Sequence, residues 1–207
     1  MINNVVLDFG HGGIDDSGTY TTAPNKMHTF DDGTIAYEGV LNRQIGYQIY
    51  RCLIDHADIN TICTVMHDDP TDLPLANRVA IANQYDPKQT IFASIHCNAS
   101  PKHNASGFEI FTTVGDTKSD ALASHIGIAL SPFIDMHNIK LRVDTSDGDL
   151  DKESNFYVLR NTRCPAVLIE CGFFDNKYDY SLLSDPTFQG EMGSWIYTGI
   201  LNYLLSE

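Results

Sequence analysis

The feature that most constrains the fold is an apolar run from Thr90 to His96, which reads Thr-Ile-Phe-Ala-Ser-Ile-His. A short run of this kind, bounded by polar residues, is typical of a strand buried on both faces of a sheet. Asn4–Asp8 and Ala166–Glu170 show a similar pattern. A sheet buried on both faces needs helices on each side, so these runs indicate an α/β fold.

Amphipathic segments alternate with these strands. From Glu38 to about His56, apolar residues recur at every fourth position, which predicts a helix. The pattern further predicts helices at 73–85, 119–137 and 186–205, and strands at 59–65, 107–113 and 156–160. Pro132 is expected to kink or end its helix, and residues 14–36 are expected to form a long polar loop. The alternation predicts a mostly parallel twisted sheet of about six strands, with helices on both faces.

Composition and charge restrict the class of protein. The apolar content of 43% argues against disorder, and the absence of repeats or low-complexity linkers predicts one domain over residues 1–207. A formal net charge of -14 disfavours binding to nucleic acid or to an anionic membrane surface. The five cysteines show no CxxC spacing, and three of them lie in or beside apolar strand patterns. We therefore expect Cys63, Cys97 and Cys171 to be buried reduced thiols.

Four ionisable side chains fall where one site can form. His11, His96 and Glu170 lie at or just beyond the C-terminal ends of predicted strands, and Glu38 begins the first predicted helix. In open α/β sheets, ligands bind at that edge. We therefore expect these side chains to converge, although they are far apart in sequence.

The residue types suggest a zinc hydrolase. Two imidazoles and one carboxylate can fill three positions of a tetrahedral zinc, and a further carboxylate can take a proton from the attacking water. Each residue taken alone also has a structural explanation. His11 can be a turn histidine, Glu38 an acid that favours a helix start, and His96 a hydrogen-bonded core histidine. Glu170 is harder to explain in this way, because burial of an acid is costly and should raise its pKa.

These four residues lie in motif segments that resemble those of one known family. The motif segments are Leu7–Gly13, Tyr37–Asn42, Leu75–Arg78, Ser94–Ala99, Gly107–Glu109, Val158–Arg160 and Pro165–Asn176. In this order they resemble the zinc-dependent N-acetylmuramoyl-L-alanine amidases of the amidase 3 type, found in bacterial autolysins and phage endolysins. The resemblance runs from Val5 to about Leu205.

The resemblance implies a function and a site. It implies one Zn²⁺ per chain held by His11, Glu38 and His96, with Glu170 as the catalytic carboxylate. The reaction would be hydrolysis of the amide between the lactyl group of N-acetylmuramic acid and L-alanine in peptidoglycan. Asp8 and Asn98 also match, and we expect them to support the site, whereas Arg78 is expected to be a structural ion-pair partner.

Two rival functions stay open. A zinc carboxypeptidase-like hydrolase would use the same ligands, but it needs a cation to hold a terminal carboxylate, and no motif supplies one. A non-catalytic peptidoglycan-binding module is the other rival, although none of the four central residues is lost. We expect a single catalytic domain at 1–207, without a separate wall-binding domain, acting as a monomer.

The site of action follows from the expected substrate. We expect the enzyme to act on the bacterial cell wall, in the periplasm or outside the cell. Residues 1–8 show no signal peptide. This fits a phage-type lysin made in the cytoplasm and released at lysis, or a chain from which a signal was removed.

Two loops depart from the family pattern. Residues 14–36 form a longer loop than in the shorter autolysins, and residues 144–151 lack the usual Arg-Gly dipeptide. We expect both loops to rim the cleft and to set which stem peptide is accepted. Asp144, Asp147, Asp149 and Asp151 alternate as in a calcium loop, but no glutamate stands at the twelfth position. A solvated acidic loop is therefore expected.

Overall fold

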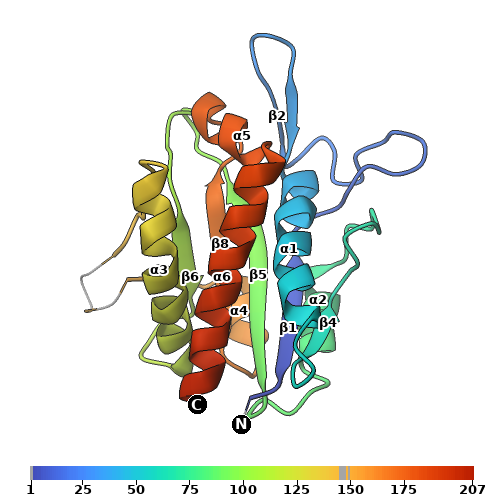
Figure 1. Ribbon diagram of the computed structural model, residues 1–207. Helices are drawn as coiled ribbons and strands as arrows, with labels where there is room; N and C mark the ends of the chain where they lie inside the picture. The colour runs from blue at the N-terminus through green and yellow to red at the C-terminus, as the bar shows by residue number, and fades with distance from the viewer. Residues whose placement is uncertain (1, 145–147, 149) are drawn as a thin grey trace.

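The computed structural model describes residues 2–144, 148 and 150–207. Its centre is a six-stranded sheet in which the parallel strands are β1 (Asn4–Phe9), β4 (Asn60–Cys63), β5 (Thr90–Asn98) and β8 (Ala166–Phe173), and β6 (Glu109–Thr112) is antiparallel to β8. The strand order across the sheet is β4, β1, β5, β8, β6 and β7 (Lys152–Glu153). In Figure 1 this sheet lies behind a layer of long helices. The predicted α/β class and the mostly parallel sheet are confirmed.

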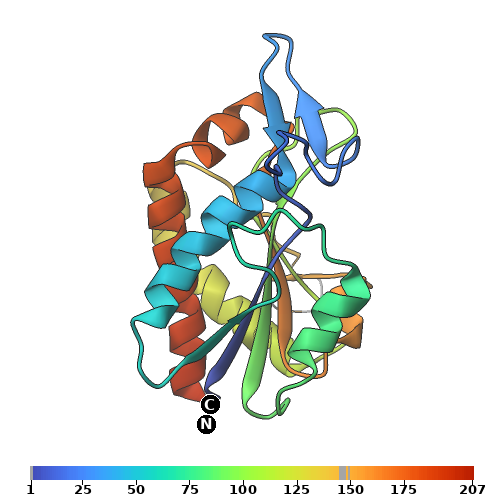
Figure 2. The ribbon, with the colours of Figure 1, turned by 90° about the vertical axis from the view of Figure 1, so that its right-hand side faces the viewer.

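Helices cover both faces of the sheet, as Figure 2 shows from the side. One face is covered by α1 (Glu38–Ile54), α3 (Lys118–Met136) and α6 (Pro186–Ser206). Within the described residues, the helices packed on the other face are the short α2 (Leu75–Ala82) and α4 (Tyr157–Asn161). Residues of both short helices line a cavity on this face.

Alternation along each strand divides the core in two. Leu7 and Val167 belong to the larger cluster under α1, α3 and α6. Their neighbours Val6 and Leu168 belong to the smaller cluster under α2 and α4. All four side chains are at most 5% exposed, so the strands are buried on both faces, as their apolar runs predicted.

The predicted strand at 156–160 is wrong, because this segment forms helix α4. Its β-branched and aromatic residues favour a strand locally, but Val158 and Leu159 are both buried in the cluster shared with α2 and β8. Hydrogen bonds four residues apart hold the turn, since Thr162 donates to the Val158 carbonyl at 2.6 Å. The sixth strand of the sheet is instead β7, which the sequence pattern did not predict.

The segment 14–36 is only partly a loop. It contains β2 (Met27–Thr29), which pairs antiparallel with β3 (Ile35–Tyr37) to form a hairpin that projects from the sheet edge.

Helix α3 continues through Pro132, so that proline does not end it. A short helix, α5 (Lys177–Leu183), was also not predicted; the Asn176 side chain accepts hydrogen bonds from its first backbone amides.

The burial predicted for the cysteines is confirmed in part. All five cysteines are free; Cys97 and Cys171 are buried as expected, whereas Cys63 is only partly buried.

In the acidic loop, Asp147 and Asp149 lie outside the described residues. Asp151 is 2% exposed and accepts a hydrogen bond from Thr112 at 2.5 Å, so the expectation of a solvated side chain is wrong there.

Candidate metal centre and active site

The site arises where the strands change from apolar to polar residues on the face under α2 and α4. Two positions beyond buried Val6 stands Asp8 in β1, and two positions beyond Leu168 stands Glu170 in β8. His96 of β5 lies opposite Glu170 in the strand register. Because side chains two residues apart share a face, these groups line one cavity of about 480 Å³.

His11 lies just beyond β1, in a backbone conformation with φ of 63°. A left-handed conformation is unfavourable for a non-glycine residue and persists where neighbours fix it. Two arginines do so here, because Arg43 Nη1 and Arg78 Nη2 donate to the His11 carbonyl at 2.8 and 3.3 Å. The imidazole is thereby directed toward the cavity, which it helps to line.

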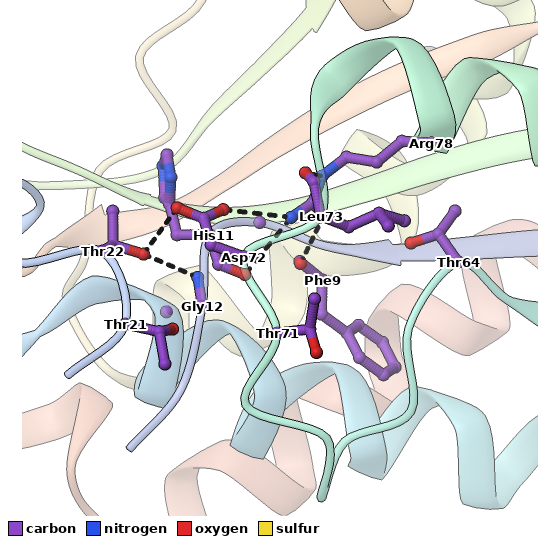
Figure 3. A network of polar contacts seen from close by, with 12 residues as sticks. Phe9, His11, Gly12, Thr21, Thr22, Thr64, Thr71, Asp72, Leu73 and Arg78 are labelled. Carbon is purple, nitrogen blue, oxygen red and sulfur yellow. Dashed lines mark hydrogen bonds and ion pairs between the residues drawn. The ribbon is translucent and has the colours of Figure 1, made fainter. Parts of the chain in front are cut away.

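Figure 3 shows the polar network that anchors this turn. Arg78 donates to the Phe9 carbonyl at 2.6 Å and lies 3.6 Å from Asp72. Asp72 accepts from Thr22 at 2.9 Å, and the Thr22 hydroxyl accepts from the Gly12 amide at 2.8 Å. The loop before α2 and the loop after β1 are therefore joined through side chains on both sides of His11.

Glu38 comes from the first turn of α1 and is 1% exposed. Its amide donates to the Lys26 carbonyl at 3.0 Å, and Asn42 donates to its Oε1 at 3.4 Å. The next residue, Gly39, packs so closely on the preceding loop that an added Cβ would lie 1.9 Å from the Gly12 carbonyl oxygen. This close approach sets Glu38 beside the turn that carries His11.

The three expected ligands converge. Glu38 Oε1 lies 3.2 Å from His11 Nε2 and 2.9 Å from His96 Nδ1. One donor atom from each residue falls within 4.8 Å of the others, which makes this the one such group of three or more found in the described part of the chain. His11 Nε2 and Glu38 Oε2 are buried without a hydrogen-bond partner. Two imidazoles and a carboxylate with unused buried donor atoms fit a zinc ion.

The electrostatics of the three residues centre on Glu38. Burial favours its neutral form, but the His11 and His96 imidazoles beside the carboxylate outweigh burial and hold the pKa of Glu38 well below its usual range. Burial lowers the pKa of His11, which favours a neutral imidazole. For His96, burial acts in the same direction, but the hydrogen bond and negative charge of Glu38 raise its pKa. An anionic carboxylate between two imidazoles is suited to a cation.

Glu170 faces the same cavity from β8, which continues past it to Phe173 rather than ending there as predicted. Its Oε2 is buried and has no hydrogen-bond partner. Burial raises the pKa of Glu170 to about 8, while the charge of His96 opposes this effect. A carboxyl group with a raised pKa and a free oxygen beside a candidate metal site can accept and return a proton.

The supporting residues occupy places close to those expected. Asp8 accepts hydrogen bonds from Thr64, Ser94 and Arg78 at 2.5, 2.6 and 2.7 Å. Arg78 is therefore the ion-pair partner that the helix position suggested. Asn98 donates to Glu109 at 2.6 Å and accepts from the Ala99 amide at 2.8 Å, so it fixes the turn after β5.

Sequence reasoning missed several residues at the site. Arg43 is 5% exposed although charged, and it stands between Asn42 and Gln44, so its neighbours in the sequence gave no signal of burial. Tyr157 lines the cavity because its segment is a helix instead of a strand. Lys26 lines it through the hairpin segment, and nothing in the sequence around Lys26 marks it. In the described part of 144–151, no residue lines the cavity.

Comparison with known proteins identifies the family. The family model for N-acetylmuramoyl-L-alanine amidase, Amidase_3, matches residues 5–202. The chain belongs to this family. Among solved structures, the N-acetylmuramoyl-L-alanine amidase from Clostridium difficile 630 is 29% identical, with a TM-score of 0.78 and coverage of 100% of this chain and 98% of the other. The catalytic domain of CwlV from Bacillus (Paenibacillus) polymyxa is 28% identical, with a TM-score of 0.76 and full coverage of both chains.

The curated proteins to which this chain is similar are longer than the chain itself. The germination-specific N-acetylmuramoyl-L-alanine amidase of Bacillus subtilis is 27% identical over 133 residues, which cover 64% of this chain and 52% of the relative. The endolysin of Bacillus phage SPP1 is 28% identical over 209 residues, covering 99% of this chain and 67% of the endolysin. The chain thus spans about half the length of the first relative.

Proposed function

We propose that this chain is a zinc-dependent peptidoglycan hydrolase that cleaves the amide between the lactyl group of N-acetylmuramic acid and L-alanine. The observation that carries the proposal is the convergence of His11, Glu38 and His96, with buried donor atoms unused, beside a cavity that Glu170 lines. Family membership supports the same substrate class.

The ligands would be His11, Glu38 and His96, with one Zn²⁺ per chain. When bound, zinc polarises a carbonyl and lowers the pKa of water in hydrolases of this kind. Arg43 and Arg78 hold the backbone of His11, and Asn42 lies beside Glu38, so the three side chains need little rearrangement to bind a metal ion. Such support from neighbouring groups typically changes metal affinity by about 10–100-fold.

Glu170 would handle the proton. As water attacks the scissile carbonyl, Glu170 accepts its proton and then delivers it to the nitrogen of the departing L-alanine amine. The unpartnered Oε2 leaves an oxygen available for that transfer. A cation at the three ligands would favour the carboxylate form of Glu170, so the group can begin the cycle as a base.

The domain organisation, oligomeric state and site of action are also proposals. We infer that residues 1–207 act as one catalytic domain and as a monomer, on the bacterial cell wall. Within the described residues, helices that combine the length and apolarity needed to cross a bilayer are absent.

One observation favours a second candidate function. The ammonium group of Lys26 lines the cavity, and a cation there could hold the terminal carboxylate required by a carboxypeptidase-like hydrolase. The two functions release different products from the same wall.

Mass spectrometry of digested peptidoglycan tests both functions. Purified walls are incubated with the protein plus zinc, with a chelator, and with the variant Glu170→Gln. Glu191→Gln is the matched control because Glu191 is exposed and pairs with His137 away from the cavity. Stem peptides beginning at L-alanine, seen only with zinc and intact Glu170, would support the amidase. Release of a C-terminal residue would instead support the peptidase, and no cleavage of several wall types would favour a binding module.

A further inference from the structure

Lys26 is held beside the candidate metal ligands by its own backbone. Its carbonyl accepts the Glu38 amide hydrogen bond at 3.0 Å, and its φ of 59° is left-handed. Its Nζ lies 3.3 Å from Glu38 Oε2, and the side chain is 47% exposed. An unfavourable backbone conformation fixed in this way often marks a functional position.

The contact between Lys26 and Glu38 is a loose one. Glu38 Oε2 has no hydrogen-bond partner, so the 3.3 Å contact is an ion pair without hydrogen-bond geometry. A cation held by the three ligands would neutralise Glu38, and the ammonium group would then lose most of its attraction to that carboxylate. The half-exposed Lys26 side chain could turn toward a ligand in the cavity.

Lys26 differs from the other cation in the lining. Arg78 is 2% exposed and is committed to Asp8, Phe9 and Leu73 through hydrogen bonds of 2.6–2.7 Å. Among the described residues that line the cavity, Lys26 is therefore the cation whose side chain remains accessible to a ligand.

The negative charge of the molecule favours a local cation at the cavity. The formal net charge is -14, and the cavity lining includes the carboxyl groups of Asp8, Asp72 and Glu170. An anionic substrate approaching these groups would be repelled unless a local positive charge offset them. A lysine at the cavity lining supplies that charge.

We propose that Lys26 binds a carboxylate of the stem peptide and so selects substrates whose second residue is acidic rather than amidated. This inference rests on the proposed amidase function. The α-carboxyl of the second stem residue lies within roughly 7 Å of the scissile nitrogen, because two residues span at most about 3.3–3.6 Å each. Lys26 is within contact distance of a proposed metal ligand, so its reach matches that spacing.

The test uses two muramoyl tetrapeptides that differ only in whether the α-carboxyl of the second residue is a carboxylate or a carboxamide. The wild-type protein should prefer the carboxylate by about twofold to fivefold in kcat/KM, the discrimination expected of one partly exposed ion pair. Lys26→Gln should bring the ratio of the two kcat/KM values close to one, mainly through KM, and Lys26→Arg should restore the preference.

Control variants make the test specific. Lys88→Gln removes the same charge from an exposed residue that precedes β5, at the opposite sheet edge, and should keep the wild-type ratio. Zinc affinity, measured by competition with a chromophoric chelator, should not fall in Lys26→Gln. A fall in zinc affinity with an unchanged substrate ratio would assign Lys26 to the metal site and overturn the proposal.

A binding measurement separates this inference from the proposed function. In the Glu170→Gln background, calorimetry with the same two peptides should show the carboxylate preference and its loss in Glu170→Gln/Lys26→Gln. If wild type hydrolyses neither peptide but the binding preference is present, the amidase proposal fails and the Lys26 proposal stands. If Lys26→Gln weakens the binding of both peptides equally, Lys26 contacts the terminal carboxylate that both peptides share. That result would overturn the inference.

Discussion

His96 of β5 and Glu170 of β8 are register partners on adjacent parallel strands. The proposed metal ligand and the proposed proton carrier are therefore fixed to each other by backbone hydrogen bonding of the sheet. A site built on regular elements holds its side chains more closely in place than a site built on loops. The other two ligands, His11 and Glu38, come from a turn and a helix start that are held against this rigid pair.

Exchange of single side chains should separate metal binding from proton transfer. Glu170→Gln should retain zinc and lose about 10³-fold or more in hydrolysis rate, within the range of general acid–base effects. His96→Ala should lose zinc as well, because one of three protein ligands is removed. Zinc content after dialysis and the hydrolysis rate are measured on the same samples. A Glu170→Gln variant of near-normal rate would remove the proton-transfer role.

Gly10 should be intolerant of even a methyl group. A Cβ at this position would lie 2.2–2.6 Å from three atoms of the His96 ring. Gly10→Ala must therefore displace the imidazole, and we expect zinc affinity to fall by about 10–100-fold, as for other changes that misorient a ligand. Chelator competition measures the affinity.

The matched control for Gly10 is Gly190 in α6, where an added Cβ meets nothing within 4 Å. Gly190→Ala should keep zinc affinity and stabilise the fold by about 0.5–1 kcal/mol, because alanine favours a helix interior. Equal zinc affinities for the two variants would contradict the steric argument.

The buried pair of Asp8 and Arg78 should make stability depend on acid pH. Burial alone would raise the pKa of Asp8, but Arg78 and the Ser94 and Thr64 hydroxyls outweigh it, so the pKa is lowered. A carboxyl whose pKa is lower in the folded state stabilises the fold above its unfolded pKa of about 3.9. That contribution should shrink as pH falls below about 4 and vanish once pH passes below the folded pKa.

Urea unfolding of wild type and Asp8→Asn across pH 3–7 measures this contribution. The difference in unfolding free energy should be constant above about pH 5 and should decrease toward acid. A difference that is independent of pH would show that Asp8 does not titrate in this way. At neutral pH, Arg78→Met should cost about 3–5 kcal/mol, because it leaves a buried carboxylate unpaired.

Tyr157 should affect substrate binding without affecting the metal. It lines the cavity from α4, is 37% exposed and lies under the Arg160 guanidinium, 5.6 Å from the ring centroid. Tyr157→Ala should raise KM several-fold, on the order of 1 kcal/mol for a lost aromatic contact, and leave zinc content unchanged. Tyr178→Ala is a suitable control because that ring is 54% exposed and is not among the lining residues.

The sequence by itself determined the elements that bury apolar surface. The runs ending near His96 and Glu170 are strands because their residues fill both faces of a parallel sheet, and the four-residue spacing after Glu38 is a helix. The positions of His11, His96 and Glu170 could also be predicted, since polar groups at the ends of buried strands require a reason to be there. Glu38, at a helix start, was grouped with them through the family resemblance.

Tertiary structure decided what local preference could not. Residues 156–160 favour a strand by composition, yet burial of Val158 and Leu159 against α2 and β8 makes them a helix and brings Tyr157 to the cavity. Lys26 gave no signal in the sequence, because its place beside the cavity depends on a backbone hydrogen bond to Glu38, twelve residues along the chain. Contacts between distant segments carry free energies as large as local propensities, and only the folded chain brings those segments together.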